Sequence, residues 1–169
     1  MKKSNIYTSD ISMENKNILS LSNLKKLKNT DNINYFDLVV QTKESYFITL
    51  EDNNYLIGLI SLAKTDEKEW LIQSIDIAEN ERRKGNAKIL IKSFFEFVDK
   101  NITDEIKQSS YSKMGLMYIS KIFNDMAKNY PTVKFIDNGK IGFHATEKEI
   151  LEISLSLKEQ NKALKNNKI

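Results

Sequence analysis

The sequence contains no cysteine and, in 169 residues, only one histidine, one proline and five glycines. Without cysteine the chain cannot form a disulfide framework, a thiolate metal site or a cysteine nucleophile. A single histidine also excludes a metal site built from several histidines. We therefore expect no metal in this protein, and its chemistry has to rest on other groups.

Long apolar runs are missing as well. The N-terminal stretch MKKSNIYTSDISMENK begins with a pair of lysines and then turns polar, so it does not resemble a signal peptide. No window of the sequence is apolar over the length that a membrane span requires. These features predict a cytoplasmic protein without a membrane partner.

Neither sign of charge dominates the chain, which has 29% charged residues and a net charge of +3. LKKLKN and the C-terminal tail are rich in lysine, and nucleic-acid binding through them would depend steeply on salt. Carboxylates are interleaved with the basic residues, so we expect no nucleic-acid partner. The length and the hydrophobic content of 40% fit one globular domain.

In the N-terminal half, apolar residues at near-helical spacing predict an amphipathic helix over about residues 13–29. Two β-rich runs, about 45–51 and 55–64, flank the sequence EDNN, and Asn and Asp tolerate the left-handed conformation of tight hairpins. The stretch WLIQSIDI predicts a third consecutive strand ending at Ile77. The apolar stripe of the helix consists of Ile18, Leu21, Leu24 and Leu27.

In the C-terminal half, the sequence RKGNAKILIKSFFEFVDKN predicts the best-defined helix of the chain. Beyond it, EIKQSS predicts a short strand, SKMGLMYISKIFNDMAKNY a helix and PTVKFID a strand. TEKE has the spacing of a capping box and predicts a helix over about 147–163. In the helix that follows Gly85, the inward residues are Ala87, Leu90, Ile91, Phe94 and Val98. In the helix of SKMGLMYISKIFNDMAKNY, they are Leu116, Ile119, Phe123 and Met126. The order indicates a mixed α/β fold with an antiparallel start.

Gly85 lies between the third strand, which ends at Ile77, and the helix predicted from RKGNAKILIKSFFEFVDKN. It comes directly after Arg82, Arg83 and Lys84. The first turn of a helix has backbone amides without intrahelical partners and the positive end of the helix dipole, both of which favour a phosphate or pyrophosphate. The alternative is that Gly85 only loosens a turn. No G-x-x-x-x-G-K-[ST] or G-x-G-x-x-G motif is present, which excludes the two most familiar phosphate loops.

The stretch resembles the acetyl-CoA signature of the GNAT superfamily of N-acetyltransferases, in which an apolar strand end and a short loop precede R/Q-x-x-G-x-G/A at the start of a helix. Here Ile77 ends the strand, and Arg82, Gly85 and Ala87 take the three motif positions. Two departures are Glu79, where many members have proline, and Ala87, the less common of the two small residues. The order of elements is similar to that of the family over roughly residues 5–140.

This resemblance implies a GNAT-like fold with a mostly antiparallel central sheet of about six strands flanked by about four or five helices. We expect one acetyltransferase-like domain over 1–169, in which residues 141–169 lie outside the resemblance and form a C-terminal helical extension predicted from their own pattern. Acetyl-CoA would be the co-substrate, with its pyrophosphate on the amides from about Arg83 to Ala87 and its pantetheine arm along the strand end. The implied cofactor-binding residues are Ile75, Ile77, Arg82, Arg83, Lys84, Gly85, Asn86 and Ala87.

The resemblance also implies a reaction, the direct transfer of an acetyl group to a primary amine in a ternary complex. The acceptor would be a small molecule or a protein, and a homodimer is compatible with the family. Tyr118, favoured over Tyr111, would protonate the leaving thiolate, although Tyr118 could instead be a core aromatic. Asp76, Glu69 and Gln73 are candidates for the base, and we name Asp76 because it would line an amine site. The alternative function is a non-catalytic CoA-binding or protein-interaction module.

Overall fold

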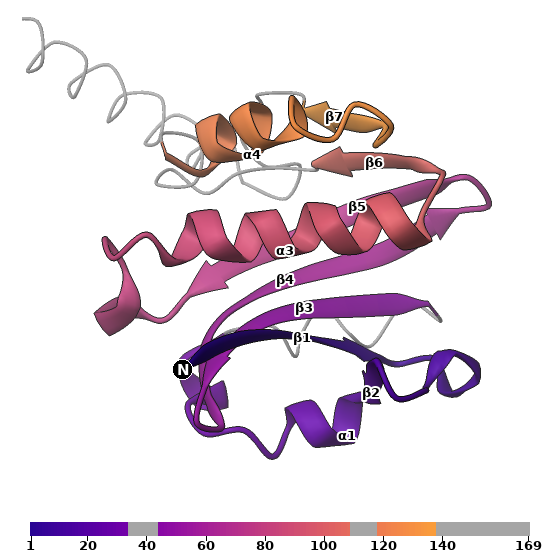
Figure 1. Ribbon diagram of the computed structural model, residues 1–169. Coiled ribbons are helices and arrows are strands. Elements are labelled where there is room, and N and C mark those ends of the chain that lie inside the picture. Colours follow the sequence, from indigo (N-terminus) through magenta and orange to yellow (C-terminus); the bar gives the residue numbers. More distant parts are fainter. Residues whose placement is uncertain (34–43, 109–117, 138–169) are drawn as a thin grey trace, which may run out of the picture.

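The computed structural model describes residues 1–33, 44–108 and 118–137 and centres on a seven-stranded sheet in the order β2-β1-β3-β4-β5-β6-β7 (Figure 1). The strands are β1 (Lys2–Thr8), β2 (Ile18–Ser20), β3 (Ser45–Asp52), β4 (Tyr55–Asp66), β5 (Glu69–Ile77), β6 (Glu105–Gln108) and β7 (Phe135–Asp137). The α-helices are α1 (Leu21–Leu24), α3 (Asn86–Asn101) and α4 (Ser120–Ala127), and the 3-10 turns are η1 (Ile11–Met13), η2 (Thr30–Asn32) and η3 (Glu79–Glu81).

The sheet is mixed, which corrects the expectation of a mostly antiparallel sheet. β1–β3, β3–β4 and β4–β5 pair antiparallel, whereas β1–β2, β5–β6 and β6–β7 pair parallel. Parallel neighbours need a crossover, and α3 and α4 supply it for β6 and β7. The described residues contain three α-helices, so the expected four or five are not found there. The mixed α/β class is confirmed, and the antiparallel part of the sheet is β1–β3–β4–β5.

The β3–β4 hairpin has the predicted position and turn. Asn53 and Asn54, at its tip, have φ angles of 49° and 65°, the left-handed conformation that asparagine tolerates. β5 follows as the predicted third strand. The β3–β4 register shifts by one residue between Leu50 and Glu51, which places a bulge in β4 at Ile57. The meander therefore confirms the strands predicted at 45–51, at 55–64 and up to Ile77.

The helix predicted over 13–29 is wrong for most of its length, because β2 replaces its centre and α1 retains only four residues. Ile18 pairs in parallel with Ile6 of β1 instead of lying on a helix. The Asn15 side chain accepts hydrogen bonds from the amides of Asn17 and Ile18, and such local bonds compete with helical ones. Leu24 is nevertheless buried, so the apolar stripe still reaches the core. β1 was not predicted.

α3 has the predicted inward face and a wider one in addition. Leu90, Ile91, Phe94 and Val98 are buried, and Ala87 packs against the same core. Phe95 and Phe97 are also buried, and Phe95 extends the apolar face toward Phe123 of α4, whereas Phe97 packs against Tyr46 of β3. α3 packs against β3, β4 and α4, as seen in Figure 1. A second, smaller core of Tyr7, Leu24, Ile33, Phe47, Leu56 and Leu59 lies beneath α1.

The later elements are shorter than predicted. β6 begins within EIKQSS as expected, and β7 takes only the last residues of PTVKFID. α4 buries Phe123 and Met126, and Ile119 packs against the same core. Leu116, the helix predicted over 147–163 and the extension at 141–169 lie outside the described residues. Within 1–33, 44–108 and 118–137, no helix has the length and apolarity to span a bilayer.

Candidate cofactor loop and active site

The loop between β5 and α3 leaves the start of α3 open. Gly85 is the N-cap of α3 with φ 80° and ψ 8°, and Arg83, two residues earlier, has φ 63°. A Cβ atom on Gly85 would meet nothing within 4 Å, so space is free beside its backbone. Glycine is therefore required here by the left-handed conformation rather than by close packing.

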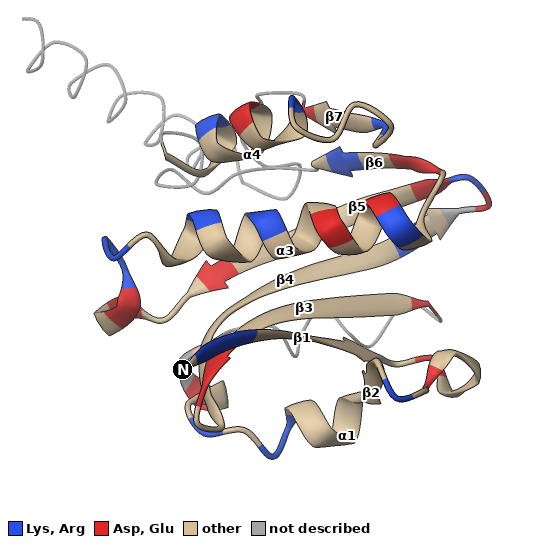
Figure 2. Ribbon diagram, in the orientation of Figure 1, with Lys and Arg blue, Asp and Glu red and all other residues tan. Residues whose placement is uncertain are grey.

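Backbone amides at this helix start have no acceptor within the described part of the chain. The amides of residues 83–87 donate to none of its atoms, and Gly85 receives no side-chain cap. The side chains of Arg82, Arg83 and Lys84 are exposed beside them. Figure 2 shows these basic residues next to the acidic turn η3 at the start of α3. Free amides, a helix dipole and positive charge together form an anion-binding arrangement.

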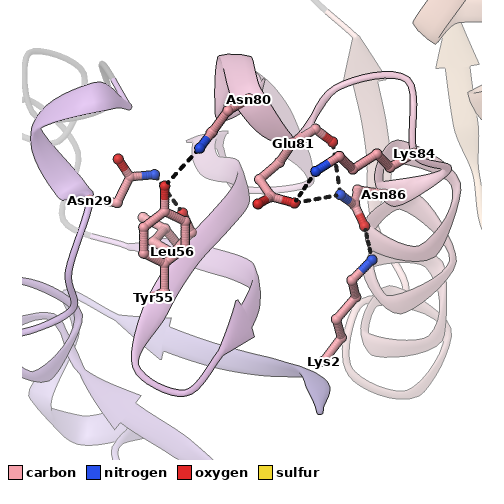
Figure 3. A network of polar contacts seen from close by, with 8 residues as sticks. All are labelled: Lys2, Asn29, Tyr55, Leu56, Asn80, Glu81, Lys84 and Asn86. Carbon is pink, nitrogen blue, oxygen red and sulfur yellow. Dashed lines mark hydrogen bonds and ion pairs between the residues drawn. The ribbon is translucent and has the colours of Figure 1, made fainter.

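The Asn86 side chain holds this loop in place through hydrogen bonds with Glu81 and with Lys2 of β1. It is only 2% exposed, and its Nδ2 donates to the carbonyl oxygen of Glu81 at 2.8 Å. Its Oδ1 accepts a hydrogen bond from Lys2 Nζ of β1 at 2.7 Å. Lys84 Nζ forms an ion pair with the Glu81 carboxylate at 3.7 Å, as Figure 3 shows. Asn86, expected to contact the cofactor, thus also holds the loop against β1.

A second anchor ties the loop to the meander. Asn80 Nδ2 donates to the hydroxyl of Tyr55, the first residue of β4, at 3.4 Å, as Figure 3 also shows. Arg82 Nε donates to the carbonyl oxygen of Ile77 at 2.9 Å, and its Nη2 lies 3.5 Å from Asp76 Oδ1. The Arg82 guanidinium therefore fastens the loop to the end of β5, a role that the sequence motif did not indicate.

The end of β5 extends beyond its described pairing with β6. The parallel register with β6 ends at Ile72 opposite Gln108, while β5 continues to Ile77. On its other side this end pairs with β4, where Ile77 lies opposite Gly58. A Cβ on Gly58 would lie 3.0 Å from the carbonyl oxygen of Asp76, so the two strands approach closely there. The predicted strand end is thus held firmly from one side only within the described residues.

The candidate catalytic side chains lie in different places. The Asp76 side chain is half-buried beside Arg82. In the β4–β5 register Asp76 lies opposite Leu59 of β4. Tyr118 is 56% exposed and immediately precedes Ile119 at the start of α4. No described contact joins these two residues. Tyr111, the alternative acid, lies outside the described residues.

The other base candidates are engaged elsewhere. Glu69, at the opposite end of β5, forms an ion pair with Lys107 at 3.2 Å. Gln73 Oε1 accepts a hydrogen bond from Ser61 Oγ at 3.4 Å. Among the residues in 1–33, 44–108 and 118–137, no cluster of three or more His, Asp or Glu side chains could hold a metal. Asp76 is therefore the base candidate that lies beside the cofactor loop.

Sequence reasoning missed the contribution of Lys2 and Glu81 to this site. Both act through Asn86, and Lys2 belongs to a strand that is far from Asn86 in the sequence. No local pattern marks such a contact, because side-chain partners from distant elements are set by the tertiary fold. The motif located the loop correctly between β5 and α3 but carried no information about what supports it.

Comparison with known proteins gives a family and several solved structures. A family model described as the acetyltransferase (GNAT) family matches residues 14–106. The catalytic domain of the Tetrahymena GCN5 histone acetyltransferase, in complex with coenzyme A, has 16% identity and a TM-score of 0.48, covering 72% of this chain and 75% of its own. AAC(6')-Iy, in complex with a bisubstrate analog, CoA-S-monomethyl-acetylneamine, has 11% identity and a TM-score of 0.46, covering 86% and 99%.

A third structure is a GNAT family acetyltransferase from Elizabethkingia anophelis with acetyl-CoA bound, with 19% identity, a TM-score of 0.44 and coverage of 76% of this chain and 85% of its own. No curated protein matches the sequence. The family model covers more than half of the chain, including β3 to β5, the loop with Gly85 and α3. The protein belongs to the GNAT family of acetyltransferases.

Proposed function

We propose that the protein transfers the acetyl group of acetyl-CoA to a primary amine by direct attack in a ternary complex. The observation that carries the proposal is the start of α3, where Gly85 leaves open space beside amides without described acceptors. A pyrophosphate is an anion of the size and charge that such a helix start binds. Membership of an acetyltransferase family supports acetyl-CoA as its source.

In this proposal some groups of the loop contact acetyl-CoA and others hold the loop in position. The amides from Arg83 to Ala87 donate to the pyrophosphate, and the exposed Arg83 and Lys84 side chains offset its charge. Arg82 and Asn86 keep the loop in place through Ile77, Glu81 and Lys2. We assign the pantetheine arm to the backbone of Ile75 and Ile77 at the end of β5, where the Ile77 carbonyl oxygen already accepts a hydrogen bond from Arg82 Nε.

The reaction itself requires three proton transfers, two from the amine nitrogen and one to the leaving thiolate. An alkyl ammonium such as that of lysine has a pKa of about 10.4, so the attacking amine must first lose a proton, a role that we assign to Asp76. As the neutral amine nitrogen attacks the thioester carbonyl, a C–N bond forms, the C–S bond breaks as the tetrahedral intermediate collapses, and the nitrogen releases its second proton to water. The thiolate that leaves belongs to a thiol of pKa about 8.5 and takes a proton, a role that we assign to Tyr118.

The first test separates an enzyme from a binding module. Acetyl-CoA at 100 times its Kd should stabilise the folded protein by about 2.7 kcal/mol, measured as a thermal shift. Release of free CoA thiol should then appear with one or more members of a panel of small amines, aminoglycosides and peptides. A shift without thiol release would favour the binding module, and the absence of any shift would contradict both readings.

The second test addresses the two catalytic assignments. Tyr118→Phe and Asp76→Asn should each lower kcat by about 10²–10⁴-fold, the usual contribution of a general acid or base. Both variants should keep the thermal shift with acetyl-CoA, because neither removes an amide of the loop. Tyr130→Phe, beyond the other end of α4, is the matched control and should retain kcat. Wild-type kcat in Tyr118→Phe would disprove its role as the acid.

A further inference from the structure

A cavity of about 400 Å³ lies between β1, the end of β3 and the segment after α1. Its lining includes Glu51, whose side chain is only 2% exposed. Three donors converge on Glu51 Oε2, namely Asn5 Nδ2 at 3.0 Å, the Tyr7 hydroxyl at 2.8 Å and Thr49 Oγ1 at 2.5 Å. The carboxylate is therefore held in one position at the wall of the cavity.

This carboxylate is buried without an ion-pair partner among the described residues. None of their lysine or arginine side chains forms an ion pair with Glu51. Burial and the hydrogen bond to Glu51 raise the pKa of Tyr7 above its usual range, so its hydroxyl keeps the proton that it donates. A buried charge supported only by neutral donors is costly, and a cation reaching it from the cavity would compensate that cost.

Three lysines line the same cavity with the opposite charge. Lys3, Lys26 and Lys28 are exposed, and none of them forms an ion pair with a described residue. Their ammonium groups would repel a polycation, whereas Glu51 would repel a simple anion. The cavity thus combines one buried negative group with several exposed positive ones.

We propose that this cavity binds a small zwitterion whose ammonium group pairs with Glu51 and whose carboxylate or phosphate is held by Lys3, Lys26 and Lys28. A volume of about 400 Å³ is within the range of small-molecule sites. The site is separate from the acetyl-CoA loop and does not depend on it. Lys2 reaches Asn86 of that loop, whereas its neighbour Lys3 lines the cavity, since successive side chains of a strand point to opposite faces.

Calorimetric titration of the full chain without acetyl-CoA tests the proposal. Phosphoethanolamine and γ-aminobutyrate are the zwitterionic probes, and their relative affinities distinguish a phosphate from a carboxylate ligand. Butylamine and butyrate each carry only one of the two charges. We expect at least one zwitterion to bind and both single-charge probes to bind much more weakly. Binding of butylamine as tight as that of the zwitterions, or no binding of either zwitterion, would overturn the proposal.

Variants assign the two ends of the ligand. Glu51→Gln should weaken zwitterion binding by about thirtyfold or more, because it removes one partner of a buried charge pair. Asp52→Asn, one residue further along β3, is the matched control and should bind as wild type. Lys26→Gln with Lys28→Gln changes only exposed side chains, so it tests the anion end even if Glu51→Gln fails to fold. Unchanged affinity in this double variant would overturn the proposal.

Discussion

Replacing Gly85 with valine is expected to abolish acetyl-CoA binding while the domain stays folded. Gly85 has φ 80°, and an L-residue in the left-handed region costs about 1–2 kcal/mol, which a domain of ordinary stability survives. No atom within 4 Å would clash with the new Cβ. The branched side chain would instead occupy the space beside the amides, where the pyrophosphate is proposed to bind. The thermal shift with acetyl-CoA should disappear, and circular dichroism should remain native.

A matched control isolates the ligand effect from the backbone strain. Asn53→Val places the same side chain at φ 49°, in the tip of the β3–β4 hairpin and outside the cofactor loop. It should lose a similar amount of stability and still be stabilised by acetyl-CoA. If Gly85→Val bound acetyl-CoA with wild-type affinity, the amides at the start of α3 could not be the pyrophosphate site.

Phe95→Ala is expected to cause the largest loss of stability among single substitutions in α3, about 3–5 kcal/mol. Phe95 is fully buried and has ring contacts with Phe94, Phe123, Tyr130 and Phe135. It therefore joins α3 to α4 and to β7, and its removal leaves a cavity among three elements. Since domains are stable by about 5–15 kcal/mol, urea denaturation should show a much lower midpoint.

Ile89→Ala serves as the control for Phe95→Ala. Ile89 lies on the same helix and is also a large apolar residue, but it is 43% exposed. Its truncation should cost well under half as much free energy of unfolding, because much less apolar area leaves the core. Equal losses in the two variants would contradict the role of the aromatic cluster, because alanine has a higher helix propensity than either residue and cannot itself cause a loss.

Elements with a strong local signal could be predicted from the sequence. The β3–β4 hairpin follows from two β-rich runs around Asn53 and Asn54, which adopt the left-handed angles that their residue type permits. α3 follows from apolar residues at helical spacing, and these residues are buried. The loop between β5 and α3 was located for the same reason, because its motif is contiguous in the chain, and its role in binding acetyl-CoA stays a prediction.

Elements that depend on distant partners could not be predicted. β2 exists because Ile18, Leu19 and Ser20 pair with β1, and the same residues also fit the period of a helix. β1 begins with exposed polar residues, so it shows little of the alternation that marks a strand. The parallel pairings β5–β6 and β6–β7 could not be predicted either. A hydrophobic pattern indicates that a segment is a strand, but it does not indicate which strand it pairs with.

In the candidate site, too, the locally encoded features could be predicted and the contacts between distant residues could not. Arg82 was expected to contact the cofactor, and in the folded chain it also binds Ile77 and Asp76 of β5. The polar network around Glu51 draws on two strands, β1 and β3, and no motif connects them. A contiguous motif can therefore indicate a candidate ligand-binding loop, whereas the groups that position this loop become visible only in the folded chain.

The mixed sheet also has a consequence for the order of folding. β3, β4 and β5 pair with their neighbours in sequence, whereas β5 reaches β6 only across α3, and β1 reaches β3 across residues 9–44. Contacts between nearby residues close smaller loops and form faster. We therefore expect the meander to form first, with β1 and α3 docking later. Asn86 meets Lys2 only after both have docked, so the N-terminal end of α3 is completed late in folding.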